Sequence, residues 1–149
     1  MALQDNGDIV RGIARFPMEL QERVHWLREL AWERYPESTE LVYIKANALA
    51  AGWSLSERST DIFVSYAVYT KHINLGFNFG NQVADPHGLL QGDGKYYRFM
   101  KLGAIEELPI DEILRFMDES WTLVYSQLKP SKKSTAGQTL LKQDSLSGK

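Results

Sequence analysis

The chain has 149 residues, of which 44% are hydrophobic and 24% are charged, and its formal net charge is −2. A chain of this length is expected to form one globular domain whose core is large enough to fold without a disulfide or a metal ion. It contains no cysteine, which excludes disulfides, thiolate nucleophiles and cysteine-ligated zinc or iron–sulfur centres.

Charge and hydropathy also indicate where the protein is expected to be located and which partners it is not expected to bind. Residues 129–149 hold five lysines against one acid, Asp144, so this segment carries +4 and the rest of the chain −6. A mildly acidic domain is not expected to bind duplex nucleic acid, which requires a basic face. No apolar run approaches the ~18 residues that span a membrane, and the first eight residues lack the pattern of a secretory signal. We therefore expect a cytoplasmic protein without a membrane partner.

The first regular element that the sequence predicts is a helix near residues 17–35, preceded by an N-terminal extension over residues 1–16. Pro17 suits the first helical position, where no N–H partner is needed, and Pro36 ends the pattern. Between them the apolar residues recur at intervals of three and four, which places them on one face of a helix. These residues are Leu20, Val24, Leu27, Ala31 and Tyr35.

Several strands are predicted to follow. Residues 41–45 and 61–69 are rich in β-branched and aromatic residues, which favours strands. Residues 47–52 are ambiguous, because their alanines favour a helix but the run is short; residues 53–55 are consistent with a short strand. A further strand is expected over residues 96–102.

Residues 72–79 alternate between apolar and polar side chains, as a strand does when one of its faces is buried. The apolar set is Ile73, Leu75, Phe77 and Phe79, and the polar set includes His72, Asn74 and Asn78. A last helix is predicted near residues 109–128, with one apolar stripe at helical spacing. After Leu128 the periodicity is lost, and residues 129–149 are predicted to be a disordered basic tail.

The order helix, strands, helix predicts an α+β fold. In this fold the N- and C-terminal helices lie on one face of an antiparallel sheet, within a domain spanning residues 17–128.

Two regions stand out as candidate ligand sites. The polar face of the strand at residues 72–79 would present an imidazole and two amides, and Arg98 joins them if the register of the next strand allows. The glycine-rich turn at residues 88–95, which precedes the strand expected at 96–102, could form an anion-binding nest of backbone N–H groups with nearby cations. The alternative is that these glycines serve only turn geometry and that the face is ordinary solvated surface. The candidate residues are His72, Asn74, Asn78, Gly92, Gly94, Lys95 and Arg98.

An acidic ridge on the first predicted helix is a third candidate. Glu22, His25, Glu29 and Glu33 fall near one another on its surface, and oxygen-rich ligand sets suit hard ions such as iron or manganese. Exposed, flexible ligands would hold such an ion weakly, because ordering them costs side-chain entropy. The alternative is an ordinary solvated helix face.

Residues 72–98 contain the patterns H-x-N-L-x-F-x-x-G and D-P-x-x-L-L-x-G-x-G-K-x-x-R. This combination resembles the YdhG-like domain, a bacterial family of unknown function, and the wider resemblance extends over about residues 27–128. The resemblance implies a helix–sheet–helix fold related to frataxin, and a frataxin-like iron chaperone is known among the relatives. The chain departs from the family pattern at Asp93, where threonine is frequent, and at Phe99, where histidine is frequent.

Three functions are compatible with these observations. The first is a small binding module without catalytic activity, with frataxin-like handling of weakly bound surface iron. The second is a protein that binds a small molecule or anion on the open sheet face and the loop at residues 88–98. The third is an enzyme that uses His72 as an acid–base group. The family supplies no catalytic residues that could be transferred to this chain.

Overall fold

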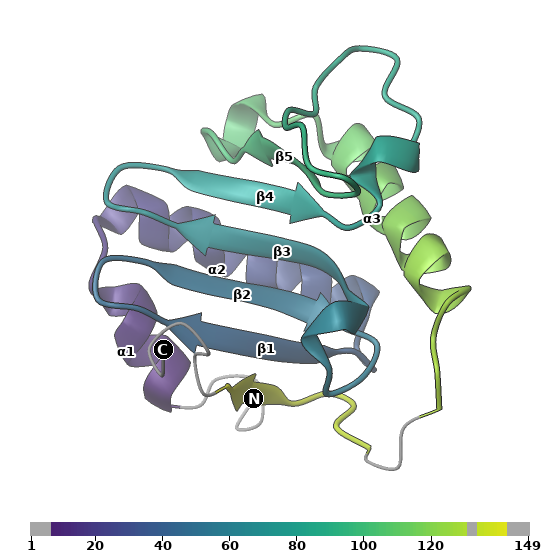
Figure 1. Ribbon diagram of the computed structural model, residues 1–149. Coiled ribbons are helices and arrows are strands. Elements are labelled where there is room, and N and C mark those ends of the chain that lie inside the picture. The colour runs from purple at the N-terminus through teal and green to yellow at the C-terminus, as the bar shows by residue number, and fades with distance from the viewer. Residues whose placement is uncertain (1–6, 131–133, 143–149) are drawn as a thin grey trace.

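The computed structural model describes residues 7–130 and 134–142. Over these residues the chain forms an α+β fold with three α-helices and one six-stranded, mostly antiparallel sheet (Figure 1). The predicted α+β class is therefore confirmed. Within the described residues, no helix combines the length and the hydropathy needed to cross a membrane.

The sheet is built from consecutive antiparallel neighbours, apart from its last strand. Its spatial order is β5-β4-β3-β2-β1-β6. The strands are β1 (Thr39–Ile44), β2 (Leu49–Ser54), β3 (Ile62–Val68), β4 (Ile73–Phe77), β5 (Arg98–Lys101) and β6 (Thr139–Leu141). The ambiguous run at residues 47–52 and the short strand predicted at 53–55 thus belong to one strand, β2, which pairs with both of its neighbours.

The register gives the sheet two different faces. On the inward face, Val42, Ala51, Tyr66, Leu75 and Met100 form one continuous row across β1 to β5. All five are buried. Because side chains alternate along a strand, their sequence neighbours point to the opposite, outward face.

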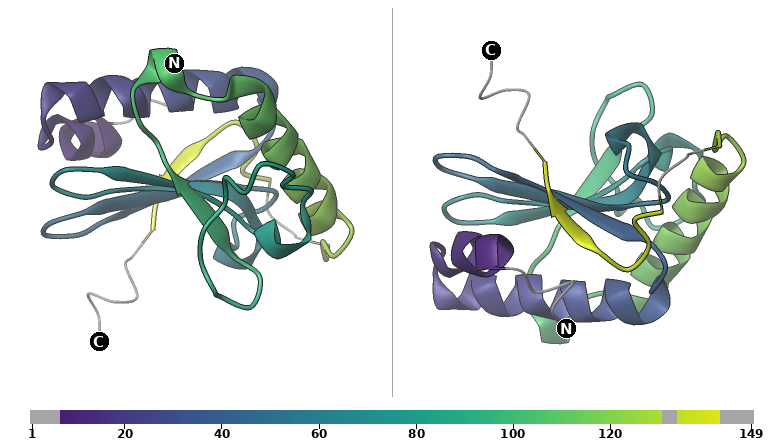
Figure 2. Two further views of the ribbon diagram at one scale, coloured as in Figure 1. Left: turned by 90° about the horizontal axis from the view of Figure 1, so that it is seen from above. Right: turned by 90° about the horizontal axis from the view of Figure 1, so that it is seen from below.

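Helices α1 (Gly7–Ala14) and α2 (Met18–Arg34) lie against the inward face (Figure 2). The α2 residues predicted to share one face, from Leu20 to Ala31, are buried at 2% exposure or less. The assignment of residues 1–16 to an extension outside the domain is wrong for α1. Ile9 and Ile13 are each 1% exposed and belong to the main core.

Helix α3 (Ile110–Tyr125) packs on β3 and β4 and leaves the layer of α2 at an angle (Figure 2). Its Phe116 ring meets the ring of Phe77 edge-on, with centroids 5.4 Å apart. The inward side chains of α2, α3 and the sheet form one hydrophobic cluster, as expected for helices that share one face of the sheet.

The predicted facing of β4 is confirmed up to its end. Ile73, Leu75 and Phe77 are fully buried, and Asn74 is partly exposed. The strand ends earlier than predicted, at Phe77, and Phe79 adopts a left-handed backbone with φ of 59° while its side chain is partly buried against the core. Asn78 supports this turn: its side-chain oxygen accepts the N–H of Phe79, and its amide donates to the carbonyl of Ile62.

The prediction of a disordered tail over residues 129–149 is wrong for Thr139–Leu141, which form β6 parallel to β1. Two backbone bonds flank this strand: the N–H of Glu40 donates to Gln138, and the N–H of Lys142 donates to Val42. The rest of that prediction falls partly outside the described residues, at 131–133 and 143–149. A strand of three residues carries too short a pattern to be recognised by periodicity.

β6 also completes a buried polar network on the inward face. Glu40 is 0% exposed, and its carboxylate receives two bonds from Arg28 Nε and one from Arg28 Nη2 at 2.6 Å. The hydroxyl groups of Tyr66 and Thr139 donate to the same carboxylate at 3.0 and 2.9 Å. A buried carboxylate is tolerated only when it is paired and hydrogen-bonded, so this network ties β6 to α2, β1 and β3.

Candidate functional site

The largest of the described concave surfaces lies where the end of α2 meets α3, and polar groups converge on it. It has two lobes of about 590 and 540 Å³ on either side of an ion pair between Arg34 and Asp118. Clefts of this size fall in the range used by small-molecule sites. The other described cavities are smaller, at about 380 and 180 Å³.

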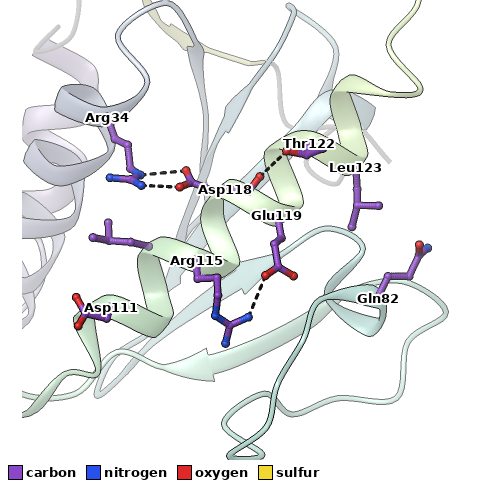
Figure 3. Close-up of a pocket in the computed structure, with 9 residues that line it drawn as sticks. Arg34, Gln82, Asp111, Arg115, Asp118, Glu119, Thr122 and Leu123 are labelled. Carbon is purple, nitrogen blue, oxygen red and sulfur yellow. Dashed lines mark hydrogen bonds and ion pairs between the residues drawn. The ribbon is translucent and has the colours of Figure 1, made fainter.

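The ion pair is bidentate (Figure 3). Arg34 donates from Nε to Asp118 Oδ1 at 3.0 Å and from Nη2 to Oδ2 at 2.5 Å. The hydroxyl of Tyr35 donates to Oδ1 as well. The parallel geometry of guanidinium and carboxylate orients the two side chains toward each other, and the pair lines both lobes.

This arrangement moves the pKa values of its members away from neutrality. The hydrogen bonds from Arg34 lower the pKa of the Asp118 carboxyl, and those bonds also raise the pKa of the guanidinium. Burial raises the pKa of the Tyr35 hydroxyl, and its bond to Asp118 adds to this effect. Near neutral pH the site therefore holds a carboxylate anion, a guanidinium cation and a neutral phenol.

The larger lobe has mainly apolar and aromatic walls. The rings of Trp121 and Tyr125, one helical turn apart on α3, stack with centroids 5.0 Å apart and planes 6° from parallel. Tyr125 is 57% exposed, so the stack presents an aromatic surface to the cleft. The remaining lining includes Tyr35, Pro36, Glu37, Ser38, Leu55, Thr122 and Leu128.

The smaller lobe is more polar. Arg115 bridges Glu119 at 3.0 Å and Glu112 at 3.3 Å, so its charge is already compensated. Gln82, Asp111 and Leu123 complete the edge of this lobe (Figure 3). With its openness to solvent and its internal ion pairs, this lobe is the weaker candidate for ligand capture.

The predicted acidic ridge lies on the solvent side of α2. Glu22, His25, Glu29 and Glu33 are all exposed. In residues 7–130 and 134–142, no group of three or more histidine, aspartate or glutamate side chains lies close enough to hold a metal ion. The structure therefore does not gather the four ridge residues into a metal centre.

The predicted sheet-face site is divided by the register. Asn74 pairs with Lys101 on the outward face, whereas Arg98 pairs with Phe77 and Met100 with Leu75 on the inward face. The expectation that Arg98 joins the outward polar residues is therefore wrong. Asn78 is also separated from them, because it lies beyond the end of β4 and supports the turn at Phe79.

The glycine-rich turn directs two backbone carbonyls toward Arg98. Arg98 Nη1 donates to the carbonyl oxygens of Gly94 and Tyr97, at 2.6 and 2.8 Å, so this cation is bonded within the turn itself. Lys95 lies over the ring of Tyr96, 5.3 Å from its centroid. Gly92 has φ of 115°, a backbone that favours glycine. The turn-geometry interpretation of these glycines fits the structure better.

His72 lies on the outward face at the β3–β4 turn. Its ring stacks on Tyr69, with centroids 4.9 Å apart and planes at 25°. It therefore forms part of an aromatic surface, together with Asn74 on the same strand.

Sequence reasoning missed the cleft. Tyr35 belongs to the apolar face predicted for the first helix, and Trp121 fits the apolar stripe predicted for the last one. Nothing in the sequence distinguishes Arg34 and Asp118, because charged residues are common on helix surfaces. The usable signal was the Trp121–Tyr125 spacing of four residues close to a helix end, where aromatic side chains exceed what the core needs.

No family model, no curated protein and no solved structure matches this chain.

Proposed function

We propose that the protein is a small binding module. Its ligand is an organic cation with an apolar body, held in the larger lobe between α2 and α3. The observation that carries this proposal is the stacked Trp121–Tyr125 pair in a cleft of about 590 Å³. Flat aromatic walls bury apolar ligand surface at little entropic cost, since aromatic side chains have few rotatable bonds.

The charges of the lobe favour a cation. Arg34 and Asp118 cancel in their bidentate pair, which leaves Glu37 as the remaining charged group of the lining. No described residue forms an ion pair with Glu37. An ammonium group over Trp121 or Tyr125 would also gain from the quadrupole of the ring. An amine with an aromatic or aliphatic body matches both features.

Binding without catalysis fits the protonation states of the site. A general acid or base works best when its pKa lies near the working pH. The pKa of Asp118 is lowered and that of Tyr35 is raised, so neither group is suited to exchange a proton near neutrality. The pair supports a structural role, in which it shapes the cleft.

Membership of the YdhG-like family, with its frataxin-like fold, iron handling and cytoplasmic location, stays a proposal from sequence resemblance. What supports it is placement: the two parts of the motif lie on and next to neighbouring strands, β4 and β5, and on the loop between them. The iron role gains no support from the exposed ridge on α2.

The test is a titration of the ¹⁵N-labelled protein followed through its four tryptophan indole signals. The probes are tryptamine and indole-3-acetate, which share a ring but carry opposite charges. We expect tryptamine to shift the indole signal of Trp121, assigned with Trp121→Phe, and to leave that of Trp26 in place. Indole-3-acetate should bind more weakly.

Two glutamine variants form a matched pair. Glu37→Gln should weaken tryptamine binding by about fivefold, the value of one close charge pair in water, whereas Glu29→Gln, on the exposed side of α2, should leave it unchanged. Equal responses of both variants, or no shift of the Trp121 signal by either probe, would contradict the proposal.

A further inference from the structure

The outward face of the sheet is a second surface, separate from the cleft. No helix of the described residues covers it, and α2 lies behind the sheet in the view of Figure 1. Side chains cover the part of this face that contains Gly52 and Gly76. Ile62 lies over Gly52, and Tyr97 lies over Gly76. A Cβ atom at Gly76 would fall 1.9 Å from the tyrosine hydroxyl. The outward residues toward the two hairpin turns are partly or fully exposed.

Small residues form the floor of this open area. One row runs Tyr43, Ala50, Ala67, Asn74 and Lys101 across β1 to β5. Its two central members are alanines, and its outer members are larger. The row therefore has its smallest side chains at the centre, with a tyrosine at one side and an amide and a lysine at the other.

The next row, at the hairpin turns, adds aromatic rings and charge. Lys45 pairs with Ala48 in the β1–β2 turn, and Tyr69 pairs with His72 in the β3–β4 turn. The stacked rings of Tyr69 and His72 lie in the row next to Ala67 and Asn74, and Lys71 is exposed at the tip of their turn. Both turns lie at the same end of the sheet, where β5 also ends with Lys101 (Figure 1).

The charge on this area has one sign. Across β1–β5 and the two hairpin turns, the one carboxylate is Glu40, which is buried on the inward face and bonded to Arg28. Among the described residues, Lys45, Lys71 and Lys101 have no ion-pair partner. The acidic residues of α2 and α3 lie on those helices and not on the outward face of the sheet.

We infer that this outward face binds single-stranded nucleic acid. Surfaces that do so combine aromatic rings, on which unpaired bases stack, with cations that follow the phosphate backbone. The Tyr69–His72 stack and Tyr43 supply the rings, and the three lysines supply the cations. A duplex is not expected to bind, because its bases are already stacked on each other and the open face is shallow.

The test is fluorescence anisotropy with a labelled oligothymidylate of about twelve nucleotides. With three lysine contacts, the slope of log K against log salt should be about −2, since each phosphate contact on a single strand contributes about −0.7. A duplex of the same length should bind more weakly at every salt concentration.

Matched variants locate the surface. Tyr69→Ala should weaken binding by about tenfold, as expected for one lost stacking contact, whereas Tyr96→Ala removes an exposed ring elsewhere and should have no effect. Lys101→Ala should reduce the salt slope by about 0.7, and Lys129→Ala should leave it unchanged. Circular dichroism of each variant verifies that it folds.

Three results would overturn the inference. One is the absence of an anisotropy change at about 20 mM salt, where phosphate contacts are strongest. A protein would then be the expected partner of this face. Another is equal weakening by Lys101→Ala and Lys129→Ala, which would place the contacts outside the sheet. The third is undiminished binding by Tyr69→Ala in its folded state.

Discussion

At the scale of single residues, the most consequential feature is a carboxylate inside the core. Glu40 is 0% exposed and is bonded to Arg28, Tyr66 and Thr139. A buried ion pair is not strong evidence of net stabilisation, because both charges lose their hydration. Removing one partner is different, since it leaves the other charge uncompensated in a region of low polarity.

Arg28→Leu should therefore destabilise the protein strongly. The expected loss is about 3–5 kcal/mol, which in a domain of this size lowers the melting temperature by about 10 °C. Thermal unfolding followed by circular dichroism measures it. Arg11→Leu is the matched control, because the Arg11–Asp8 pair is exposed and such pairs contribute little. Similar melting temperatures for the two variants would show that Glu40 tolerates burial alone.

The Arg34–Asp118 pair should make the free energy of unfolding depend on pH in the acid range. The folded-state pKa of Asp118 lies below its ordinary value of 3.8, so its contribution is complete above pH 3.8 and is lost as the pH falls through the folded-state value. Asp118→Asn removes this dependence. In urea unfolding, the midpoints of the parent and the variant should differ most near neutral pH and converge at the lowest pH. A constant difference across the acid range would contradict this prediction.

At the scale of elements, the helices and strands with the longest apolar patterns are the ones that the sequence predicts correctly. Helix α2, helix α3 and strands β3 and β4 each repeat their apolar period several times, and the sequence placed each within a few residues of its observed bounds. Strand β6 has three residues, and α1 has eight. β6 is positioned by its pairing with β1, and α1 by its contacts with Ile44 and Leu49. These partners are distant in sequence, so they produce no local periodicity.

The candidate sites show the same limit. The polar face of β4 was predictable from alternation, but the partner of Asn74 depends on the β4–β5 register, which the 20-residue connection between these strands does not determine. The cleft joins the end of α2 to α3, and Arg34 and Asp118 are 84 positions apart. Such a pair can be found only once the packing of the two helices is known.

β6 should contribute to stability although it is short. Truncation after Leu128 removes the acceptor of the Glu40 N–H and the Thr139 hydroxyl that bonds to its carboxylate. A buried polar group that loses its partner costs about 1–3 kcal/mol, so the melting temperature should fall by several degrees. Truncation after Lys142 leaves all these contacts in place and is the control. Equal melting temperatures for both truncations would show that the segment is dispensable.

At the scale of the whole molecule, one core joins parts that the sequence pattern separates. The hydrophobic cluster includes Ile9 of α1, Leu27 of α2, Trp53 of the sheet and Phe116 of α3, and the polar network attaches β6 to it. Around this core the charges are unevenly distributed, with carboxylates on the outer sides of α2 and α3 and unpaired lysines at one end of the sheet. The two proposed binding surfaces follow from this division.

A single shared core predicts a single cooperative unfolding transition. Far-ultraviolet circular dichroism reports mainly the helices, and tryptophan fluorescence reports Trp53, which is 0% exposed in the sheet, together with three tryptophans on α2 and α3. In urea the two signals should change at the same midpoint and with the same slope, the usual test of two-state behaviour. Arg28→Leu should shift both midpoints equally, because Arg28 lies on a helix and its partner Glu40 on a strand. If the helical signal were lost first, α2 and α3 would unfold separately from the sheet, and the cleft between them would have to be treated as a mobile surface.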